Sequence, residues 1–228
     1  MTAKLRKMFP KEQAWLYWLT LLTAIMITWS GIVFEQKLFR MIPLYISLIV
    51  SLLMSSANRY APLIGSINCL LYCVALASVK LYASAAQTLF ISAPMQFITF
   101  IRWNNQPYKQ STQFRQLNKK QWILTGVGFV IGFFLLKYIL AAADANSQLL
   151  DTICTLIGFC TSILTMLSFR EYAWTSLIGN FLSIFLYLSL LPTHPEQLTY
   201  VFYAIHGFIC TVMQFICVHR LYKEQQSA

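Results

Sequence analysis

Long apolar blocks recur along the whole chain, and they limit the folds it can adopt more than any other feature of the sequence. Each block is roughly 16–20 residues long, the length that a helix needs to cross a hydrocarbon core of about 30 Å. Only helices and closed barrels satisfy every backbone hydrogen bond inside such a core, and uninterrupted apolar blocks indicate helices. The sequence therefore predicts an all-α membrane protein with about eight transmembrane helices.

The composition agrees with this class, because 58% of the residues are hydrophobic and only 11% are charged. A soluble domain of this size carries about 25% charged residues. The predicted membrane spans are 15–33, 42–57, 61–79, 82–101, 122–141, 149–167, 174–191 and 200–218. The loops are short, the longest being the polar segment 102–121, so residues 1–228 are predicted to form a single transmembrane domain.

The net charge of +10 is distributed unevenly over the predicted loops. With the N-terminus inside, most of the seventeen basic residues fall on the inner side: Lys4, Arg6, Lys7, Lys11, Arg59, Arg102, Lys109, Arg115, Lys119, Lys120, Arg170, Arg220 and Lys223. The positive-inside rule produces this asymmetry. It predicts a multi-pass protein of the inner (cytoplasmic) membrane with both termini in the cytoplasm. It also explains the basic charge, so no nucleic-acid partner is predicted. The predicted environment of the protein is the lipid bilayer.

Two short strings recur in the two halves of the chain. Leu-Ile-Gly occupies 63–65 and 177–179, and Met-Gln-Phe-Ile occupies 95–98 and 213–216. Transporters with parallel repeats are built from two such units related by an axis along the membrane normal. The strings therefore predict two parallel three-helix bundles, 42–101 and 149–218. A linker helix at 122–141 joins them, and an extra N-terminal helix lies at 15–33.

Polar side chains line up at helical spacing in several predicted helices. They include Gly65, Asn68 and Tyr72; Ser92, Gln96, Thr99 and Trp103; Asp151, Thr155, Gly158, Ser162 and Thr165; Ser176, Asn180, Ser183 and Tyr187; and Tyr203, Gly207, Cys210 and Gln214. Such residues either hold membrane helices together or face a polar path. We favour a shared polar cavity near the midplane. The predicted substrate-binding residues are Asn68, Tyr72, Gln96, Trp103, Trp174, Asn180, Tyr187 and Gln214.

The chemistry of these side chains favours an uncharged or weakly charged solute that carries a ring and hydroxyl groups, such as a nucleoside or vitamin. A cationic ring would also stack on the aromatic faces. No acidic residue lies in the middle of a predicted span, which favours uncoupled, facilitated movement. The sequence shows no nucleophile–base pair and no cluster of metal ligands at a suitable spacing, so no enzyme activity, metal or cofactor is predicted.

Several motifs, in order and spacing, resemble the PnuC family of nicotinamide riboside transporters over about residues 20–223. They are Asn58-Arg59-Tyr60, Asn68 with Tyr72, the run 94–98, Trp103, Asp151, Phe169-Arg170-Glu171, Asn180 and Ser183-Ile184. The resemblance implies a fold similar to full-length SWEET sugar transporters, a homo-oligomer, and facilitated transport followed by trapping through a cytoplasmic kinase. It also implies that Asn68, Gln96 and Asn180 lie near the substrate path.

The chain departs from the family pattern at three positions. Ala173 and Ser176 stand where the family has tryptophans, with Trp174 one place away, and Ser162 stands where the family has a glutamine. Nicotinamide riboside is the leading predicted substrate. Thiamine, riboflavin or a deoxynucleoside are the alternatives, as is a membrane scaffold or receptor whose polar stripes only join helices.

Overall fold

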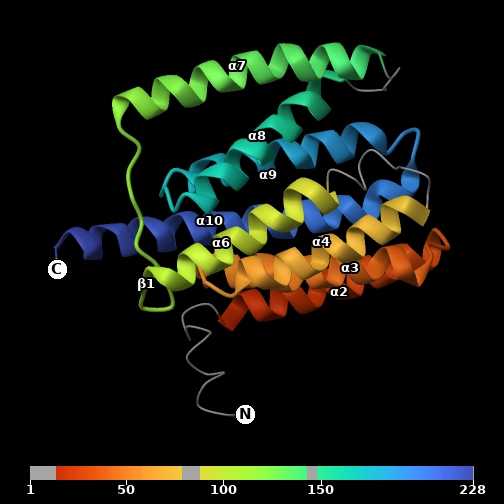
Figure 1. Ribbon diagram of the computed structural model, residues 1–228. Coiled ribbons are helices and arrows are strands. Elements are labelled where there is room, and N and C mark those ends of the chain that lie inside the picture. The colour runs from red at the N-terminus through yellow and green to blue at the C-terminus, as the bar shows by residue number, and fades with distance from the viewer. Residues whose placement is uncertain (1–13, 79–87, 143–147, 228) are drawn as a thin grey trace.

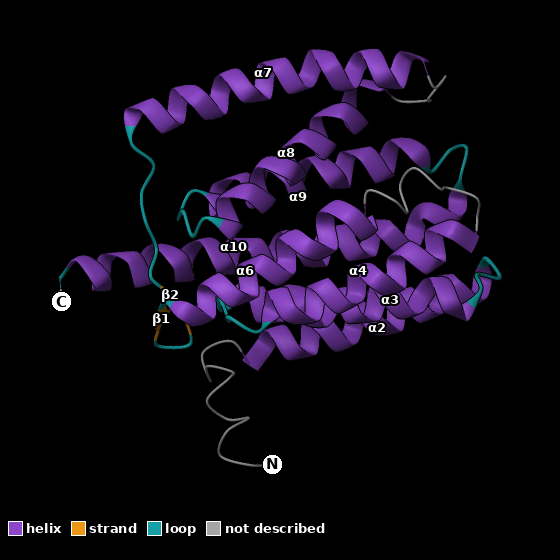
Figure 2. Cartoon of the chain, in the orientation of Figure 1, coloured by secondary structure: helices purple, strands orange, loops and turns teal. Residues whose placement is uncertain are grey.

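The computed structural model describes residues 14–78, 88–142 and 148–227, and eight α-helices make up most of this part of the chain (Figures 1 and 2). The helices are α2 (Ala14–Val33), α3 (Leu38–Ser55), α4 (Ala61–Ser78), α6 (Ala93–Asn105), α7 (Lys119–Ala142), α8 (Gln148–Met166), α9 (Tyr172–Leu190) and α10 (Leu198–Gln226). The minor elements are a π-helical turn η2 (Thr88–Ser92), a 3-10 turn η3 (Pro195–Gln197), and strands β1 (Pro107–Tyr108) and β2 (Ser111–Thr112). The predicted all-α class is confirmed.

Most helix boundaries lie within a few residues of the predicted ones, and two regions differ. Helix α10 continues to Gln226, eight residues past the predicted end at 218, because the polar stretch 219–226 contains no helix breaker. In the predicted loop 102–121, β1 and β2 form a short antiparallel hairpin. The start of the predicted span 82–101 lies outside the described residues, and its described part runs through η2 into α6.

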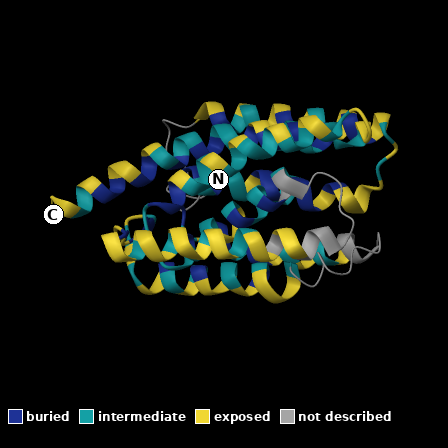
Figure 3. Ribbon diagram, turned by 90° about the horizontal axis from the view of Figure 1, so that it is seen from above, coloured by how far each residue is buried: buried dark blue, intermediate teal, exposed yellow. Residues whose placement is uncertain are grey.

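The outer surface of the described helices is apolar, as a membrane protein requires. By length and composition, α2, α3, α9 and the stretch Pro195–Gln226 are each apolar enough to cross a membrane. Exposed residues recur along the outer faces of the helices (Figure 3). The large apolar ones among them include Trp18 and Phe90, which are more than 70% exposed. Soluble monomers rarely expose so many apolar side chains side by side, whereas lipid covers them in a membrane.

The contacts between helices in the first half of the chain have counterparts in the second half. Helix α4 packs between α3 and α6, and α9 packs between α8 and α10. The two groups meet where α3 contacts α10 and where α6 contacts α8. If α3 corresponds to α8, α4 to α9 and α6 to α10, each of these contacts has an equivalent among the others, as expected for repeated units. The result is a ring of helices, with α7 outside against α8 and α2 against α3 and α10.

One end of the ring, called the basic end below, carries most of the described cations. Helices α3, α6, α8 and α10 end there, and α4, α7 and α9 begin there (Figure 1). Its basic residues are Arg59, Arg102, Lys109, Arg115, Lys119, Lys120, Arg170, Arg220 and Lys223. The other end, called the opposite end, has Lys37 between α2 and α3 and Arg40 in the first turn of α3. The charge asymmetry predicted from the loops thus coincides with the two ends of the ring.

Candidate functional site

A cavity of about 170 Å³ lies between α3, α4, α6 and α8, so that both helix groups contribute to it; we call it the central cavity. Its lining residues are Val50, Met54, Ala61, Pro62, Met95, Gln96, Thr99, Thr161, Ser162 and Thr165. Typical ligand pockets have volumes of about 300–1,000 Å³. A ring-bearing solute therefore fills this cavity only when the helices around it move apart.

The hydroxyl groups of the central cavity present acceptors rather than donors. Thr99, Thr161, Ser162 and Thr165 each donate their hydroxyl hydrogen to the backbone carbonyl oxygen four residues earlier, at 2.6–2.9 Å. The hydrogens are thereby occupied, while the oxygen lone pairs remain available. A solute that donates hydrogen bonds is therefore favoured. The predicted polar stripes contained Thr99, Ser162 and Thr165, although none of the three was among the predicted site residues.

Gln96 supplies the amide of the central cavity, and a glycine makes room for it. Its Nε2 lies 3.3 Å from Sγ of Cys69 on α4. Its Oε1 lies directly against Gly65, so that a Cβ atom at position 65 would collide with it. In the other helix group, Oδ1 of Asn180 lies 2.7 Å from the place of a Cβ atom on Gly207. An amide thus covers a helical glycine in each group.

Asn68 and Gln214 are buried amides that are only partly satisfied. Nδ2 of Asn68 donates to the carbonyl oxygen of Pro43 at 3.0 Å and to Oγ of Ser47 at 2.8 Å, which joins α4 to α3. Its Oδ1 has no hydrogen-bond partner among the described residues, and neither has Nε2 of Gln214 on α10. Asn68 therefore holds helices together through one end of its amide and leaves the other end for another partner.

The predicted tyrosines lie in an aromatic cluster toward the opposite end. Tyr72 on α4 lies close to Tyr187 on α9 and to Tyr200 and Tyr203 on α10. The rings of Tyr187 and Tyr200 stack, with their centroids 5.5 Å apart. Tyr72, Tyr200 and Tyr203 also pack against a buried apolar cluster on α2 and α3. These tyrosines come from both helix groups.

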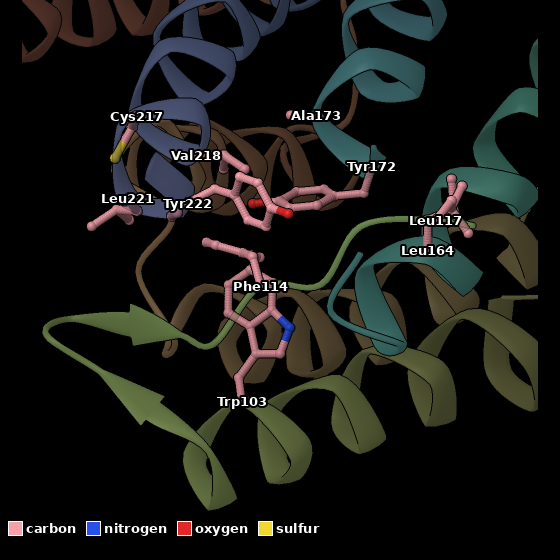
Figure 4. Close-up of a cluster of buried hydrophobic side chains, with 11 residues drawn as sticks. Trp103, Phe114, Leu117, Leu164, Tyr172, Ala173, Cys217, Val218, Leu221 and Tyr222 are labelled. Carbon is pink, nitrogen blue, oxygen red and sulfur yellow. The ribbon is translucent and has the colours of Figure 1, made fainter. Parts of the chain in front are cut away.

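A second aromatic cluster, called the basic-end cluster, is shown in Figure 4. Its buried members are Ala57, Trp103, Phe114, Leu117, Leu164, Tyr172, Ala173, Cys217, Val218, Leu221 and Tyr222. Trp103 on α6 has no exposed surface, and its Nε1–H donates to the carbonyl oxygen of Thr165 at 3.0 Å. Phe114 and Tyr172 each place their ring centroid 5.9 Å from the centroid of Trp103. Trp103 is therefore a packing residue in this arrangement, and it lies outside the cavity lining.

Residues 106–118, between α6 and α7, are tied to the basic ends of both helix groups. The N–H of Arg59 donates to the carbonyl oxygen of Gln110 at 3.1 Å, and the N–H of Arg115 donates to that of Ser168 at 2.9 Å. Gln225 of α10 accepts from the N–H of Phe114 at 3.0 Å. These contacts hold the Phe114 ring in the basic-end cluster.

A surface ion pair adds to these ties. Nζ of Lys109 lies 2.6 Å from a carboxylate oxygen of Glu224, and this hydrogen bond raises the pKa of Lys109. The sequence indicates only a polar loop here. The apolar residues Phe114 and Leu117 within that loop were the signal that it packs against the helices.

Trp174, the second predicted tryptophan, lies apart from the central cavity. It is 52% exposed and packs on Phe215 with ring centroids 4.4 Å apart, at the basic end. Among the described residues, Gln96 is the one of the eight predicted site residues that lines the central cavity. The other seven lie outside its lining, the tyrosines toward the opposite end and the tryptophans at the basic end.

Comparison with known proteins identifies the family of this chain. The model of the nicotinamide mononucleotide transporter family matches residues 37–215. This chain belongs to that family. The curated nicotinamide riboside transporter PnuC of Haemophilus influenzae is 30% identical over 125 residues. The alignment covers 53% of this chain and 55% of the relative, so the chain spans about half the length of the curated relative that it matches.

A solved structure shares the fold of this family member. The crystal structure of the vitamin B3 transporter PnuC superposes with a TM-score of 0.73 and covers 92% of this chain and 93% of that chain. Its sequence identity is 19%, so the match concerns the fold. The resemblance to PnuC proteins seen in the sequence motifs is thereby confirmed.

The family match begins at residue 37, so helix α2 precedes it. Polar contacts at three levels fix α2 and the residues that follow it to the second helix group. Thr20 lies 2.9 Å from Nε2 of His206, and the hydroxyls of Ser30 and Thr199 lie 2.8 Å apart. Beyond α2, Nε2 of Gln36 donates to the carbonyl oxygen of Glu196 at 2.8 Å. His206 thus joins α2 to α10.

Proposed function

We propose that this protein transports nicotinamide riboside across the cytoplasmic membrane by facilitated diffusion. The observation that carries the proposal is the central cavity, which offers hydroxyl lone pairs and one amide between two aromatic clusters. Nicotinamide riboside supplies complementary groups, since its ribose hydroxyls and carboxamide N–H groups are donors. Membership of the nicotinamide mononucleotide transporter family and the likeness to PnuC support the same substrate class.

The two aromatic clusters are suited to act as gates in this proposal. The tyrosines close the path toward the opposite end, and Trp103, Phe114 and Tyr172 close it toward the basic end. Rocking of the two helix groups around a fixed site would open one cluster at a time, as in other transporters with repeated units. No carboxylate lies among the described residues that line the central cavity, which favours uncoupled movement.

The proposed function also includes an orientation of the protein in the membrane and its assembly into oligomers. The basic end faces the cytoplasm, as the positive-inside rule requires, so both termini are cytoplasmic. As the PnuC resemblance implies, we expect a homo-oligomer. The second candidate substrate class is another ring-bearing vitamin or a nucleoside, namely thiamine, riboflavin or a deoxynucleoside. Ala173 and Ser176 favour it, because these small side chains replace two family tryptophans.

Calorimetry on the purified protein tests the proposal directly. We expect saturable binding of nicotinamide riboside, and uptake into proteoliposomes that a proton gradient leaves unchanged. Gln96→Leu should weaken binding about tenfold, because a hydrogen bond to this half-buried amide contributes about 1–1.5 kcal/mol. The matched control is Asn104→Leu, an exposed position on the same helix α6, which should bind normally.

Each other outcome of this experiment has a definite meaning. Binding of thiamine, riboflavin or a deoxynucleoside in place of nicotinamide riboside would establish the second substrate class. If folded protein bound none of them, the scaffold or receptor interpretation would replace transport. Uptake that collapsed with the proton gradient would contradict uncoupled movement.

The gate at the basic end gives a separate prediction. Phe114→Ala removes the ring that residues 106–118 place against Trp103 and Tyr172, so the closed state should lose stability relative to the state open at the basic end. We expect faster equilibrative efflux from preloaded proteoliposomes and faster labelling of a cysteine introduced at Thr165. Phe114→Leu, which keeps an apolar side chain of similar volume, should lie between wild type and Phe114→Ala. Unchanged labelling in both variants would contradict a gating role.

A further inference from the structure

A second cavity, of about 160 Å³, lies at the basic end between the starts of α7 and α9 and the end of α10. We call it the Glu171–Trp174 groove. Ala173 and Val218 line the groove and also belong to the basic-end cluster. On the other side of that cluster, Trp103 is bonded to Thr165, which lines the central cavity. The cluster therefore separates the two cavities.

Aromatic rings form much of the wall of the groove, which Gln116 and Arg170 also line. Trp174 packs on Phe215 with a centroid distance of 4.4 Å, and Phe215 stacks on His219 at 6.0 Å with an angle of 26° between the rings. Trp122 of α7 forms another part of the lining, and Trp122 and Trp174 are each 52% exposed. Open indole faces attract flat cations through the negative potential of the ring.

A buried carboxylate lines the same groove. The side chain of Glu171 is only 6% exposed, and its Oε2 has no hydrogen-bond partner among the described residues. Its Oε1 accepts a long hydrogen bond from Nε of Arg170 at 3.5 Å, within ion-pair distance, so Arg170 offsets part of its charge. The guanidinium of Arg170 also lies 4.3 Å above the ring of Tyr222. A buried carboxylate with an unused acceptor is costly unless a cation or donor completes it.

We propose that the Glu171–Trp174 groove binds the cationic pyridinium ring of the solute as a release site, after the solute has left the central cavity. The inference rests on the proposed transport of nicotinamide riboside. The basic residues at this end repel a cation that leaves the protein, and Glu171 supplies a local counter-charge. The aromatic faces of Trp174 and Phe215 hold the flat ring beside it.

The groove could bind the ammonium group of a zwitterionic lipid through the same chemistry. The experiment must therefore distinguish binding of the solute from binding of a lipid headgroup. The probe is 1-methylnicotinamide, which carries the cationic ring without the sugar, and nicotinamide is its neutral counterpart. Excited indole transfers an electron to a pyridinium ring, so binding is measured as quenching of tryptophan fluorescence in detergent without added lipid. We expect quenching by 1-methylnicotinamide to reach saturation, whereas quenching by nicotinamide should show no saturable component.

Variants locate the quenching. Trp174→Leu should abolish the saturable component, whereas Trp174→Phe should retain binding in a competition assay because phenylalanine keeps a ring face. Glu171→Gln should weaken binding about tenfold, which is the effect of losing about 1.4 kcal/mol. The matched control is Trp18→Leu on α2. This tryptophan is 73% exposed and does not line the groove, so the variant should be quenched as the wild type is.

Any one of three quenching results would overturn the release site. They are equal quenching by nicotinamide, persistence of the saturable component in folded Trp174→Leu, and competitive loss of the signal on adding phosphatidylcholine but not phosphatidylglycerol. Uptake of nicotinamide riboside by proteoliposomes is measured in parallel. Saturable uptake without saturable quenching would overturn the groove alone, whereas quenching without uptake would overturn the proposed function and with it the release role.

Discussion

Trp103→Ala is expected to lower the free energy of unfolding by about 3–5 kcal/mol, the usual cost of replacing a buried large aromatic residue with alanine. Trp103 has no exposed surface, and its ring packs edge-on against Phe114 and Tyr172. The substitution also leaves the carbonyl oxygen of Thr165 without its indole donor. Thermal or denaturant unfolding of the purified protein in detergent measures the change.

Two further variants separate packing from substrate contact. Trp103→Phe keeps most of the buried ring and loses the hydrogen bond to Thr165, so we expect a loss of about 0.5–1.5 kcal/mol with transport retained. Trp18→Ala, on the outer face of α2, should change stability by less than about 0.5 kcal/mol. If Trp103→Ala remained as stable as wild type but lost solute binding, Trp103 would be a substrate contact, as its sequence position suggested.

The helices were largely predictable from the sequence because the membrane fixes their length. Apolar blocks of the length that spans a hydrocarbon core leave few alternatives to helices. The continuation of α10 to Gln226 was not predictable in the same way, since residues 219–226 are polar and hydropathy has no signal there. Nor does hydropathy report the hairpin Pro107–Thr112, which depends on local turns and on contacts with α10.

The candidate site was predictable only in part, for a geometric reason. Helical spacing shows which side chains share a face, and Gln96 and Thr99 were found on one face in this way. Spacing does not show which neighbour covers that face. Asn68 and Gln96 were therefore grouped together, although Asn68 donates to α3 and Gln96 lies over Gly65 in the central cavity. That distinction depends on the order in which the helices pack.

Tertiary contacts of loop residues account for the rest of the difference. Phe114 lies in a polar segment without periodicity, and it is buried because Gln225 and the Ser168–Arg170 turn bind the backbone on both sides of it. Trp174 shows the reverse case. Its aromatic character suggested a place in the central cavity, but its position on α9 directs it to the groove at the basic end. Residue type alone does not distinguish these places.

Gly65→Ala is expected to reduce uptake at least about tenfold while leaving the protein folded. The added methyl group would collide with Oε1 of Gln96, so the carboxamide must turn away from α4 and into the central cavity. Overpacking of this kind costs about 1–3 kcal/mol, and the better helix propensity of alanine offsets about 1 kcal/mol of it. Initial uptake rates in proteoliposomes, compared with the melting temperature, separate the functional effect from the stability effect.

A double substitution tests whether Gln96 is the reason for this effect. Without the long amide, the methyl group at position 65 has nothing to displace, so Gly65→Ala combined with Gln96→Ala should transport as Gln96→Ala does alone. The two substitutions would then show a coupling energy of at least about 1 kcal/mol, as expected for residues in direct contact. Gly128→Ala and Gly158→Ala are the matched controls, since a Cβ atom at either position meets no atom within 4 Å. If these controls lost as much uptake as Gly65→Ala, glycine in the helices would matter for flexibility, and the contact with Gln96 would not explain the loss.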